Sequence, residues 1–197
     1  MTDPTKSTPA RERLLAAADH LFYSQGYHST GINQIIDEAE VAKASFYNHF
    51  QSKDELALAY LKDRHERRLA SLREQMEAHA STEKRISDVF EHLETFALEE
   101  QFRGCGQLNM AAEFPKDDHP IRVQIRTHKQ SVRNFLRDIL SGSSSETETE
   151  NAERLARSVY LLYEAALVES QTLSDLWPIQ KAKEAALRLV AASERSA

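Results

Sequence analysis

The stretch that decides the fold lies in residues 26–56 and reads GYHSTGINQIIDEAEVAKASFYNHFQSKDEL. Apolar residues recur in it at helical spacing, which predicts two short helices over residues 31–39 and 42–50. Only Glu40 and Val41 separate these two helices. Two short helices joined by so tight a connection are typical of a helix-turn-helix.

The second short helix is predicted to have one apolar face and several polar positions. Phe46 and Phe50 lie four residues apart, so they share a face and can pack on Ile35 and Ala39. The other faces are available to a partner, and they carry Lys43, Ser45, Tyr47, Asn48 and His49. A small packed corner with a solvated outer face would show the same pattern, so the spacing alone favours neither interpretation.

Charge gives local rather than overall support for nucleic-acid binding. The chain has a formal net charge of −6, and its first 53 residues hold five basic and six acidic side chains. No acidic residue occurs from 41 to 53, however, where Lys43 and Lys53 are basic and the flanks are acidic. A local positive charge of this kind is what a helix needs to approach phosphates.

The sequence on either side is also predicted to be helical. A first helix is expected over residues 9–25, with Gly26 in the position of a left-handed helix stop. Thr30 can cap the helix that follows it. Residues 52–55, Ser-Lys-Asp-Glu, match a capping box, which opens a long helix to about residue 78.

The rest of the chain adds five helices, so we expect an all-α fold of about nine helices. They are predicted from residue 82 to a break at 103–106, and over about 108–113, 121–139, 151–173 and 178–193. Residues 141–150 are acidic and of low complexity, which predicts a mobile loop. Glycine and proline occur only five times each in 197 residues, too few for the turns of a sandwich or barrel.

Composition excludes several classes of protein. Cys105 is the only cysteine, which excludes a disulfide framework within one chain and a four-cysteine zinc site. No run approaches the ~18 apolar residues of a membrane span, and the first ten residues lack the apolar core of a secretory signal. We therefore expect a cytoplasmic protein with no membrane association. Glu113, Asp117, His119 and His128 are near in sequence, but their spacing fixes no metal geometry, so no metal is expected.

Over about residues 10–60 the sequence resembles the TetR family of bacterial transcriptional repressors. The matching positions are Gly26–Ile32, Ile35, Ala39, Val41, Lys43–Phe50 and Ser52–Leu56. The resemblance implies a three-helix, helix-turn-helix DNA-binding domain over residues 1–56 and a helical ligand-binding and dimerisation domain over residues 57–197. It further implies a homodimer that binds a pseudo-palindromic double-stranded DNA operator and is released by a small-molecule effector.

The resemblance also assigns roles by position within the helix-turn-helix. It implies that phosphates or base edges are contacted by Thr30, Lys43, Ser45, Tyr47, His49 and Lys53. Asn48 occupies a variable position that helps to select the DNA sequence, and Asn pairs best with adenine. The chain departs from the family at Glu40, where glycine is usual, at Ala42, where Ser usually caps the helix, and at Ala44, where Gly is common. A non-glycine residue at positive φ, and a lost cap, each cost roughly 1 kcal/mol.

In the C-terminal domain, the resemblance implies that the last two long helices pair with their copies in a four-helix bundle. Residues that could form the apolar seam are Leu155, Val159, Leu162, Ala166, Leu173, Leu187 and Val190. The candidates for an effector pocket are Phe90, Leu93, Phe96, Met110, His128, Tyr160, Tyr163 and Trp177, with Asn109, Glu113 and Glu164 as polar anchors. For each apolar member, a place in the ordinary core is the default interpretation.

Cys105 supports an alternative, a redox- or electrophile-sensing repressor that is switched through this thiol. It lies between two glycines at a predicted helix start, where backbone N–H groups stabilise a thiolate, and Arg103 is nearby. A small buried residue in a tight helix connection is the competing interpretation. The sequence shows no nucleophile–base pair, glycine-rich phosphate loop or informative pair of carboxylates, so no enzyme activity and no cofactor are expected.

Overall fold

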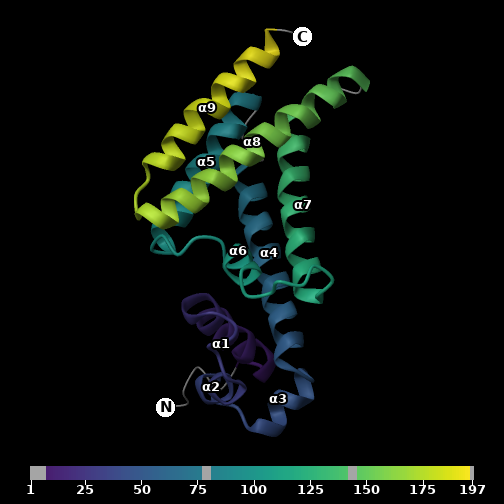
Figure 1. Cartoon of the computed structure of the whole chain (residues 1–197), viewed down its shortest axis with the longest axis vertical. Helices are drawn as coiled ribbons and strands as arrows, with labels where there is room; N and C mark the ends of the chain where they lie inside the picture. Colours follow the sequence, from purple (N-terminus) through teal and green to yellow (C-terminus); the bar gives the residue numbers. More distant parts are fainter. Residues whose placement is uncertain (1–7, 77–80, 142–145, 196–197) are drawn as a thin grey trace. The chain divides into compact units, whose positions relative to one another are not determined.

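The computed structural model describes residues 8–76, 81–141 and 146–195, and every regular element in these ranges is an α-helix. The helices are α1 (Ala10–Gln25), α2 (Ile32–Glu38), α3 (Lys43–His49), α4 (Lys53–Met76), α5 (Thr82–Glu99), α6 (Gly106–Ala111), α7 (Pro120–Leu140), α8 (Glu146–Leu173) and α9 (Trp177–Glu194) (Figure 1). The predicted all-α class is therefore confirmed. Within these ranges no helix is long and apolar enough to cross a membrane.

The chain divides into two compact units, and each is built from separate stretches of sequence. The first unit comprises residues 1–66 and 106–126, and the second comprises residues 67–105 and 127–197. Helices α4 and α7 each contribute residues to both units. A functional boundary after residue 56 stays a prediction.

The core of the first unit holds its short helices in place. Helices α2 and α3 have seven residues each, and isolated helices shorter than about 12 residues are marginal in water. Packing against the core stabilises α2 and α3. The core is one cluster in which Leu14, Ile35, Phe46 and Leu56 are all fully buried. As predicted, Phe46, Phe50, Ile35 and Ala39 belong to this common core. The cluster also takes in Met110 of α6 and, from beyond α6, Phe114, Ile121 and Ile125.

The ends of the helices in the first unit differ in part from the predictions. Ser52 caps α4 as predicted, because its Oγ accepts from the Glu55 N–H at 3.1 Å. The second bond of the predicted capping box is displaced by one residue, since the Glu55 carboxylate accepts from the Gln51 N–H at 2.7 Å rather than from that of Ser52. Gly26 has the expected positive φ of 92°, but its ψ of 165° is extended rather than helical. The predicted cap at Thr30 is wrong, since α2 begins after Gly31 with no side-chain cap.

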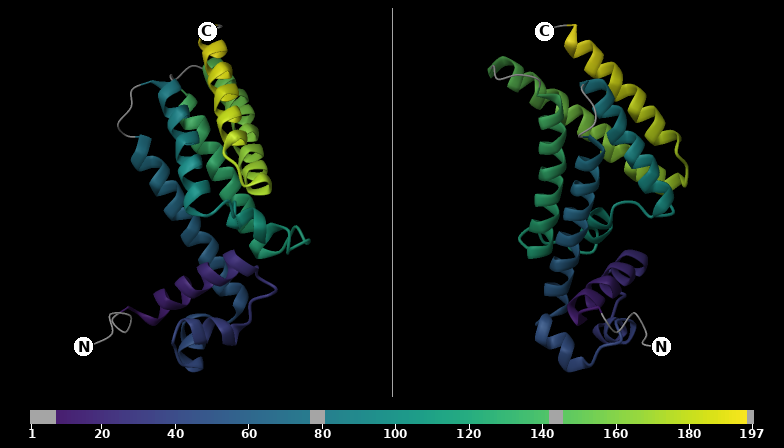
Figure 2. Two further views of the ribbon diagram at one scale, coloured as in Figure 1. Left: turned by 90° about the vertical axis from the view of Figure 1, so that its left-hand side faces the viewer. Right: turned by 180° about the vertical axis from the view of Figure 1, so that it is seen from behind.

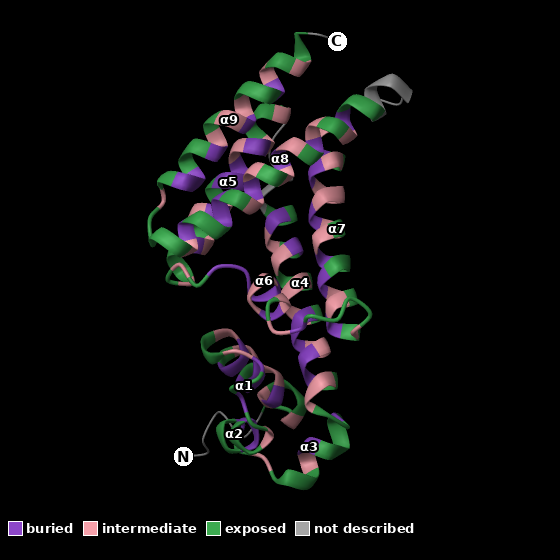
Figure 3. Cartoon of the chain, viewed as in Figure 1, coloured by how far each residue is buried: buried purple, intermediate pink, exposed green. Residues whose placement is uncertain are grey.

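In the second unit, α5, α8 and α9 pack against one another (Figure 2). Each helix has a buried face and an exposed face (Figure 3). The buried faces supply Phe90 and Leu93 from α5, Val159 and Ala166 from α8, and Val190 from α9. An ion pair joins Lys183 Nζ of α9 to Glu91 Oε1 of α5 at 2.7 Å.

The predicted loop over residues 141–150 is wrong in its second half, because α8 already begins at Glu146. Acidic residues favour the first turn of a helix, whose N-terminus carries partial positive charge, so the sequence Glu-Thr-Glu-Thr-Glu suits a helix start. Residues 142–145 lie outside the described ranges. So do residues 77–80, where the predicted end of the long fourth helix falls.

Candidate nucleic-acid interface

Helix α3 presents polar side chains to solvent because its apolar face is anchored in the core. Phe46 is fully buried and Phe50 is 2 % exposed, with ring centroids 6.3 Å apart. The ring of Tyr47 meets that of Phe46 edge-on, with centroids 5.1 Å apart, and its side chain is 46 % exposed. Lys43, Asn48 and His49 are also exposed, and Ser45 is partly exposed. One short helix therefore carries Lys43, Ser45, Tyr47, Asn48 and His49 of the predicted DNA-binding residues.

The other two, Thr30 and Lys53, bind carbonyl groups of the turn between α1 and α2. Thr30 is 1 % exposed, and its hydroxyl donates to the Gly26 carbonyl at 2.6 Å and accepts from Gln25 Nε2 at 3.1 Å. The Lys53 ammonium donates to the carbonyls of Tyr27 and Thr30 at 3.0 and 2.9 Å, and it lies 4.0 Å from the Tyr27 ring centroid. An ammonium has three donors, so these bonds use two of the three N–H groups of Lys53.

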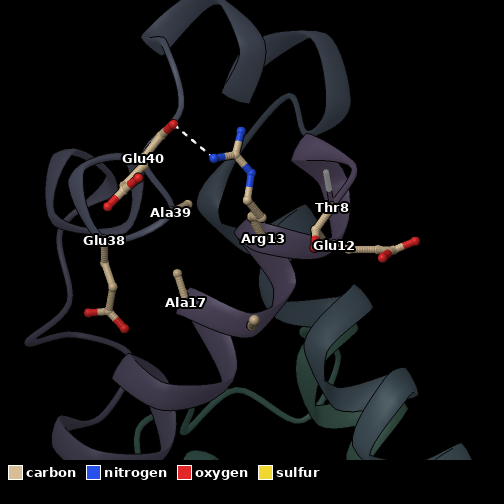
Figure 4. Close-up of a pocket in the computed structure, with 8 residues that line it drawn as sticks. Thr8, Glu12, Arg13, Ala17, Glu38, Ala39 and Glu40 are labelled. Atoms are coloured by element: carbon tan, nitrogen blue, oxygen red, sulfur yellow. Dashed lines mark hydrogen bonds between the residues drawn. The ribbon is translucent and has the colours of Figure 1, made fainter. Parts of the chain in front are cut away.

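The turn between α2 and α3 has the strained backbone that the sequence predicts. Glu40 has a φ of 51°, in the left-handed region that favours glycine. Arg13 Nη1 of α1 donates to the Glu40 carbonyl at 3.1 Å and so fixes the turn (Figure 4). Beside this bond lies a hollow of about 390 Å³ whose lining includes Glu12, Glu38 and Glu40. These carboxylates make the hollow unsuitable for a phosphate. As expected for Ala42, α3 begins without a side-chain cap.

Glu113 holds the turn between α1 and α2 from a distant part of the sequence. Its Oε1 accepts from the Tyr27 N–H at 2.8 Å, and its Oε2 accepts from the His28 N–H at 2.7 Å. The His28 ring nitrogen Nε2 lies 3.1 Å from the Glu113 carbonyl oxygen. Glycine is favoured at position 26 by its φ of 92°, and a Cβ there would come within 2.9 Å of Glu113 Oε1, so the carboxylate would have to move. Sequence reasoning missed this contact, because no local pattern links residues so far apart.

Aromatic rings and a carboxylate complete the support of the same turn. The Phe114 ring lies 4.9 Å from that of Tyr27 and 5.6 Å from that of His28, between centroids. The Tyr27 hydroxyl donates to Asp54 of α4, and His119 Nε2 lies 3.5 Å from the other oxygen of that carboxylate. Burial and the hydrogen bond to Asp54 both raise the pKa of Tyr27, so its hydroxyl stays protonated.

The predicted effector residues fall in both compact units. Asn109, Met110 and Glu113 belong to the first unit, where Met110 is 3 % exposed and lies in the core. The second unit holds Phe90, Leu93, Phe96, His128, Tyr160 and Tyr163. Of these, Phe96 and Tyr160 are partly exposed and the others are buried. Their part in effector binding stays a prediction.

Cys105 is a buried free thiol in the second unit. Its Sγ lies 4.0 Å from Lys129 Nζ, and that ammonium pairs with Glu164 Oε2 at 2.5 Å. Burial lowers the pKa of Lys129, but its electrostatic interactions with Cys105 and Glu164 and the hydrogen bond to Glu164 outweigh burial and raise the pKa overall. Among the described residues, no group of three or more His, Cys, Asp or Glu side chains could hold a metal ion.

The all-α fold and the exposed polar side chains of α3 define a class of protein, the helix-turn-helix regulators. Comparison with known proteins identifies the family within this class. The family model for bacterial regulatory proteins of the tetR family matches residues 14–60, and the model for the tetracyclin repressor-like C-terminal domain matches residues 82–186. The HTH-type transcriptional regulator LmrA of Bacillus subtilis is 27 % identical over 173 residues, which cover 86 % of this chain and 90 % of LmrA. The HTH-type transcriptional activator FasR of Mycolicibacterium smegmatis is 35 % identical over 134 residues, covering 68 % and 60 % of the two chains.

Solved structures agree with the sequence matches. SCO4454, a TetR-family transcriptional regulator from Streptomyces coelicolor, superimposes with a TM-score of 0.75 at 28 % identity and 95 % coverage of both chains. The chain belongs to the TetR family, and it is a transcription regulator rather than an enzyme.

Proposed function

We propose that the protein is a repressor that binds a pseudo-palindromic operator as a homodimer and releases it when a small molecule binds. The observation that carries the proposal is the amphipathic placement of α3, which is anchored by Phe46 and exposes Lys43, Tyr47 and Asn48. Because its target is bacterial DNA, we also propose that it acts in the cytoplasm.

Each exposed side chain has a distinct proposed role at the DNA. Lys43, Tyr47 and His49 bind phosphates, which sets register without reading sequence, and Lys53 adds its remaining N–H. Asn48 reads a base edge, best an adenine, in the major groove. Two copies of α3 in a dimer would reach successive major grooves about 34–36 Å apart, or a multiple of this distance.

DNA binding is tested by selecting bound sequences from random duplex DNA and then measuring affinity by fluorescence anisotropy. The selected sequences should contain an inverted repeat, and affinity should fall steeply with salt. Lys43→Ala should weaken binding to all sequences and reduce the salt slope by about one per subunit, whereas Asn48→Ala should relax preference at particular base pairs. Lys181→Ala, at an exposed position on α9, is the control. Salt-independent binding, or selection of no repeat, would contradict the proposal.

An exposed apolar surface supports the homodimer. Leu161 and Val168 lie two turns apart on one face of α8 and are 66 % and 38 % exposed, and Leu189 of α9 is 39 % exposed. This differs from the predicted seam, because Val159, Ala166 and Val190 are buried within the chain's own core. We therefore place the interface on Leu161, Val168 and Leu189.

Sedimentation at micromolar concentration tests this assignment. The unmodified chain should be dimeric, and Leu161→Glu with Val168→Glu should yield a folded monomer that loses specific DNA binding. Leu98→Glu, at a 55 % exposed leucine of α5, is the matched control and should remain dimeric. A monomeric unmodified chain would refute the homodimer.

The direction of regulation is part of the proposal, since FasR is described as an activator whereas the family as a whole is named for repressors. A reporter gene behind a promoter that contains the selected repeat should be silenced by this protein. Higher expression in its presence would show an activator instead.

A second candidate function, sensing through Cys105, is favoured by one contact, the Lys129 ammonium 4.0 Å from its sulfur. A positive charge at this distance stabilises a thiolate, which is the nucleophilic form. The thiolate would add to the C=C bond of an electrophile such as a maleimide: a C–S bond forms, the C=C π bond breaks, and the resulting carbanion takes a proton from water. The thioether carries no charge, so Lys129 would then have only Glu164 as an anionic neighbour. N-ethylmaleimide should then release DNA from the unmodified protein but not from Cys105→Ser. If both release DNA equally, or neither does, this candidate fails.

A further inference from the structure

The second unit contains a guanidinium that is only partly satisfied by the chain. Arg68 of α4 donates from Nη2 to the Tyr163 hydroxyl of α8 at 2.5 Å, and its Cζ lies 3.7 Å from the centroid of the Phe96 ring of α5. Its other terminal nitrogen, Nη1, is buried without a hydrogen-bond partner. In the described ranges no carboxylate pairs with Arg68.

A second polar group of the second unit also has a buried nitrogen without a hydrogen-bond partner. His92 lies one turn before Phe96 on α5, and its Nδ1 is buried without a partner. Burial and the charge of Arg68 lower the pKa of His92 to about 4, so its ring is neutral at pH 7. His92 and Phe96 share a face of α5, and Arg68 lies over the Phe96 ring, so the His92 ring and the guanidinium lie on the same side of that helix. The neutral ring can donate one hydrogen bond without adding charge.

The two unpartnered nitrogens, Arg68 Nη1 and His92 Nδ1, lower the stability of the fold unless a bound group supplies hydrogen-bond acceptors. A buried donor without a partner costs more than a hydrogen bond returns, and an uncompensated buried charge is strongly destabilising. Nearly all buried polar groups in proteins are bonded, so exceptions point to a ligand, an ion or a functional role. Here the unsatisfied groups are a cation and a neighbouring ring nitrogen, and both suit an anionic oxygen.

We propose that Arg68 and His92 bind the carboxylate of a small organic acid, whose apolar part packs against Phe96 and Tyr163. Nη1 of Arg68 donates to one carboxylate oxygen and the His92 ring donates to the other. Tyr163 positions the guanidinium through its hydroxyl, while Phe96 covers one face of it. This inference rests on the proposed function, because it assigns a chemical class to the effector.

Binding is measured by calorimetry on the full chain with benzoate, phenylacetate and hexanoate, each compared with its uncharged amide. The acids should bind with saturation and the amides at least tenfold more weakly. Arg68→Met should weaken acid binding about ten- to hundredfold, as expected for loss of a hydrogen bond to a charged group. Arg188→Met is the matched control, since Arg188 is 81 % exposed on α9, and it should bind the acids normally.

Thermal unfolding separates a binding role from a merely structural one. Removing an uncompensated cation should leave the melting temperature of Arg68→Met unchanged or higher without ligand, whereas loss of a structural arginine would lower it. Tyr163→Phe should keep the fold but weaken acid binding, because the guanidinium loses its positioning hydrogen bond. The proposal is overturned if none of the acids binds, if acids and amides bind alike, or if Arg68→Met binds the acids as well as the unmodified chain.

The effector role is tested separately by adding the same acids to the DNA complex. Acid binding that releases DNA supports both proposals. Acid binding that leaves DNA binding unchanged would keep the carboxylate site and refute the effector-released repressor.

Discussion

The hydrogen bonds of Glu113 allow a quantitative prediction for the turn between α1 and α2. In Glu113→Ala the backbone N–H groups of Tyr27 and His28 lose charged acceptors at 2.8 and 2.7 Å. Hydrogen bonds to charged groups contribute about 1.5–3 kcal/mol each when buried. These are partly exposed, and water can replace the carboxylate, so we take about 1 kcal/mol for each. We expect the free energy of unfolding to fall by about 2 kcal/mol, which corresponds to roughly 4–8 °C in melting temperature for a chain of this size.

The assay is thermal and urea unfolding followed by circular dichroism, with Glu99→Ala as the control at an exposed carboxylate of α5. The melting temperature of Glu113→Gln should lie between those of Glu113→Ala and the unmodified chain, because an amide oxygen can accept one of the two hydrogen bonds. A melting temperature within 1–2 °C of the unmodified chain, which is less than about 1 kcal/mol, would refute the reasoning. If the same variant instead lost only its response to effector, Glu113 would be the effector anchor that the sequence suggests.

The backbone at Gly26 and Ala42 and the hydrogen bonds of Glu91 each affect stability in a predictable direction. Gly26→Ala should destabilise the fold by at least about 1 kcal/mol in urea titrations, since φ is 92° and its Cβ would lie 2.9 Å from Glu113 Oε1. Ala42→Ser should stabilise by about 1 kcal/mol, because the N-cap has extended backbone and no side-chain bond; an unchanged denaturation midpoint would count against it. The hydrogen bonds from Lys183 and Ser87 lower the pKa of Glu91 to about 2 from 4.5, so its stabilising effect is present above pH 4.5 and disappears as the pH falls through 2. Because the Glu91 side chain is 47 % exposed, this stabilising effect is under about 1 kcal/mol. The difference in stability between the unmodified chain and Glu91→Gln should close as the pH falls from 4.5 to 2.

Local rules predicted the parts of the site that depend on neighbours in sequence. Phe46 and Phe50 share a face because helical spacing requires it, and Glu40 has the positive φ expected at a position where glycine is usual. Thr30 was expected to cap α2, but its hydroxyl bonds to the Gly26 carbonyl instead, because that carbonyl lies within the same turn. A Ser or Thr hydroxyl has several nearby backbone partners, and spacing does not choose among them.

Contacts between distant parts of the chain were beyond sequence reasoning. Nothing in the local pattern indicates that Met110 joins the core of the helix-turn-helix or that Glu113 binds the Tyr27 N–H. The seam on α8 could not be predicted for a similar reason. Apolar residues occur on more than one face of this helix, and periodicity does not show which face packs against the rest of the chain. Burial settles the point, with Val159 inside and Leu161 outside.

The discontinuous first unit has a consequence for building chimeras between regulators. A chimera made by a single crossover behind the helix-turn-helix would divide the core of this unit between two parents. Such a crossover would join α1–α3 of this chain to residues 106–126 of another regulator. The side chains that replace Phe114, Ile121 and Ile125 would then not be complementary to the core they complete. The transferable cassette is therefore bipartite, residues 1–66 together with 106–126. A graft of both pieces carries its own complementary surfaces with it.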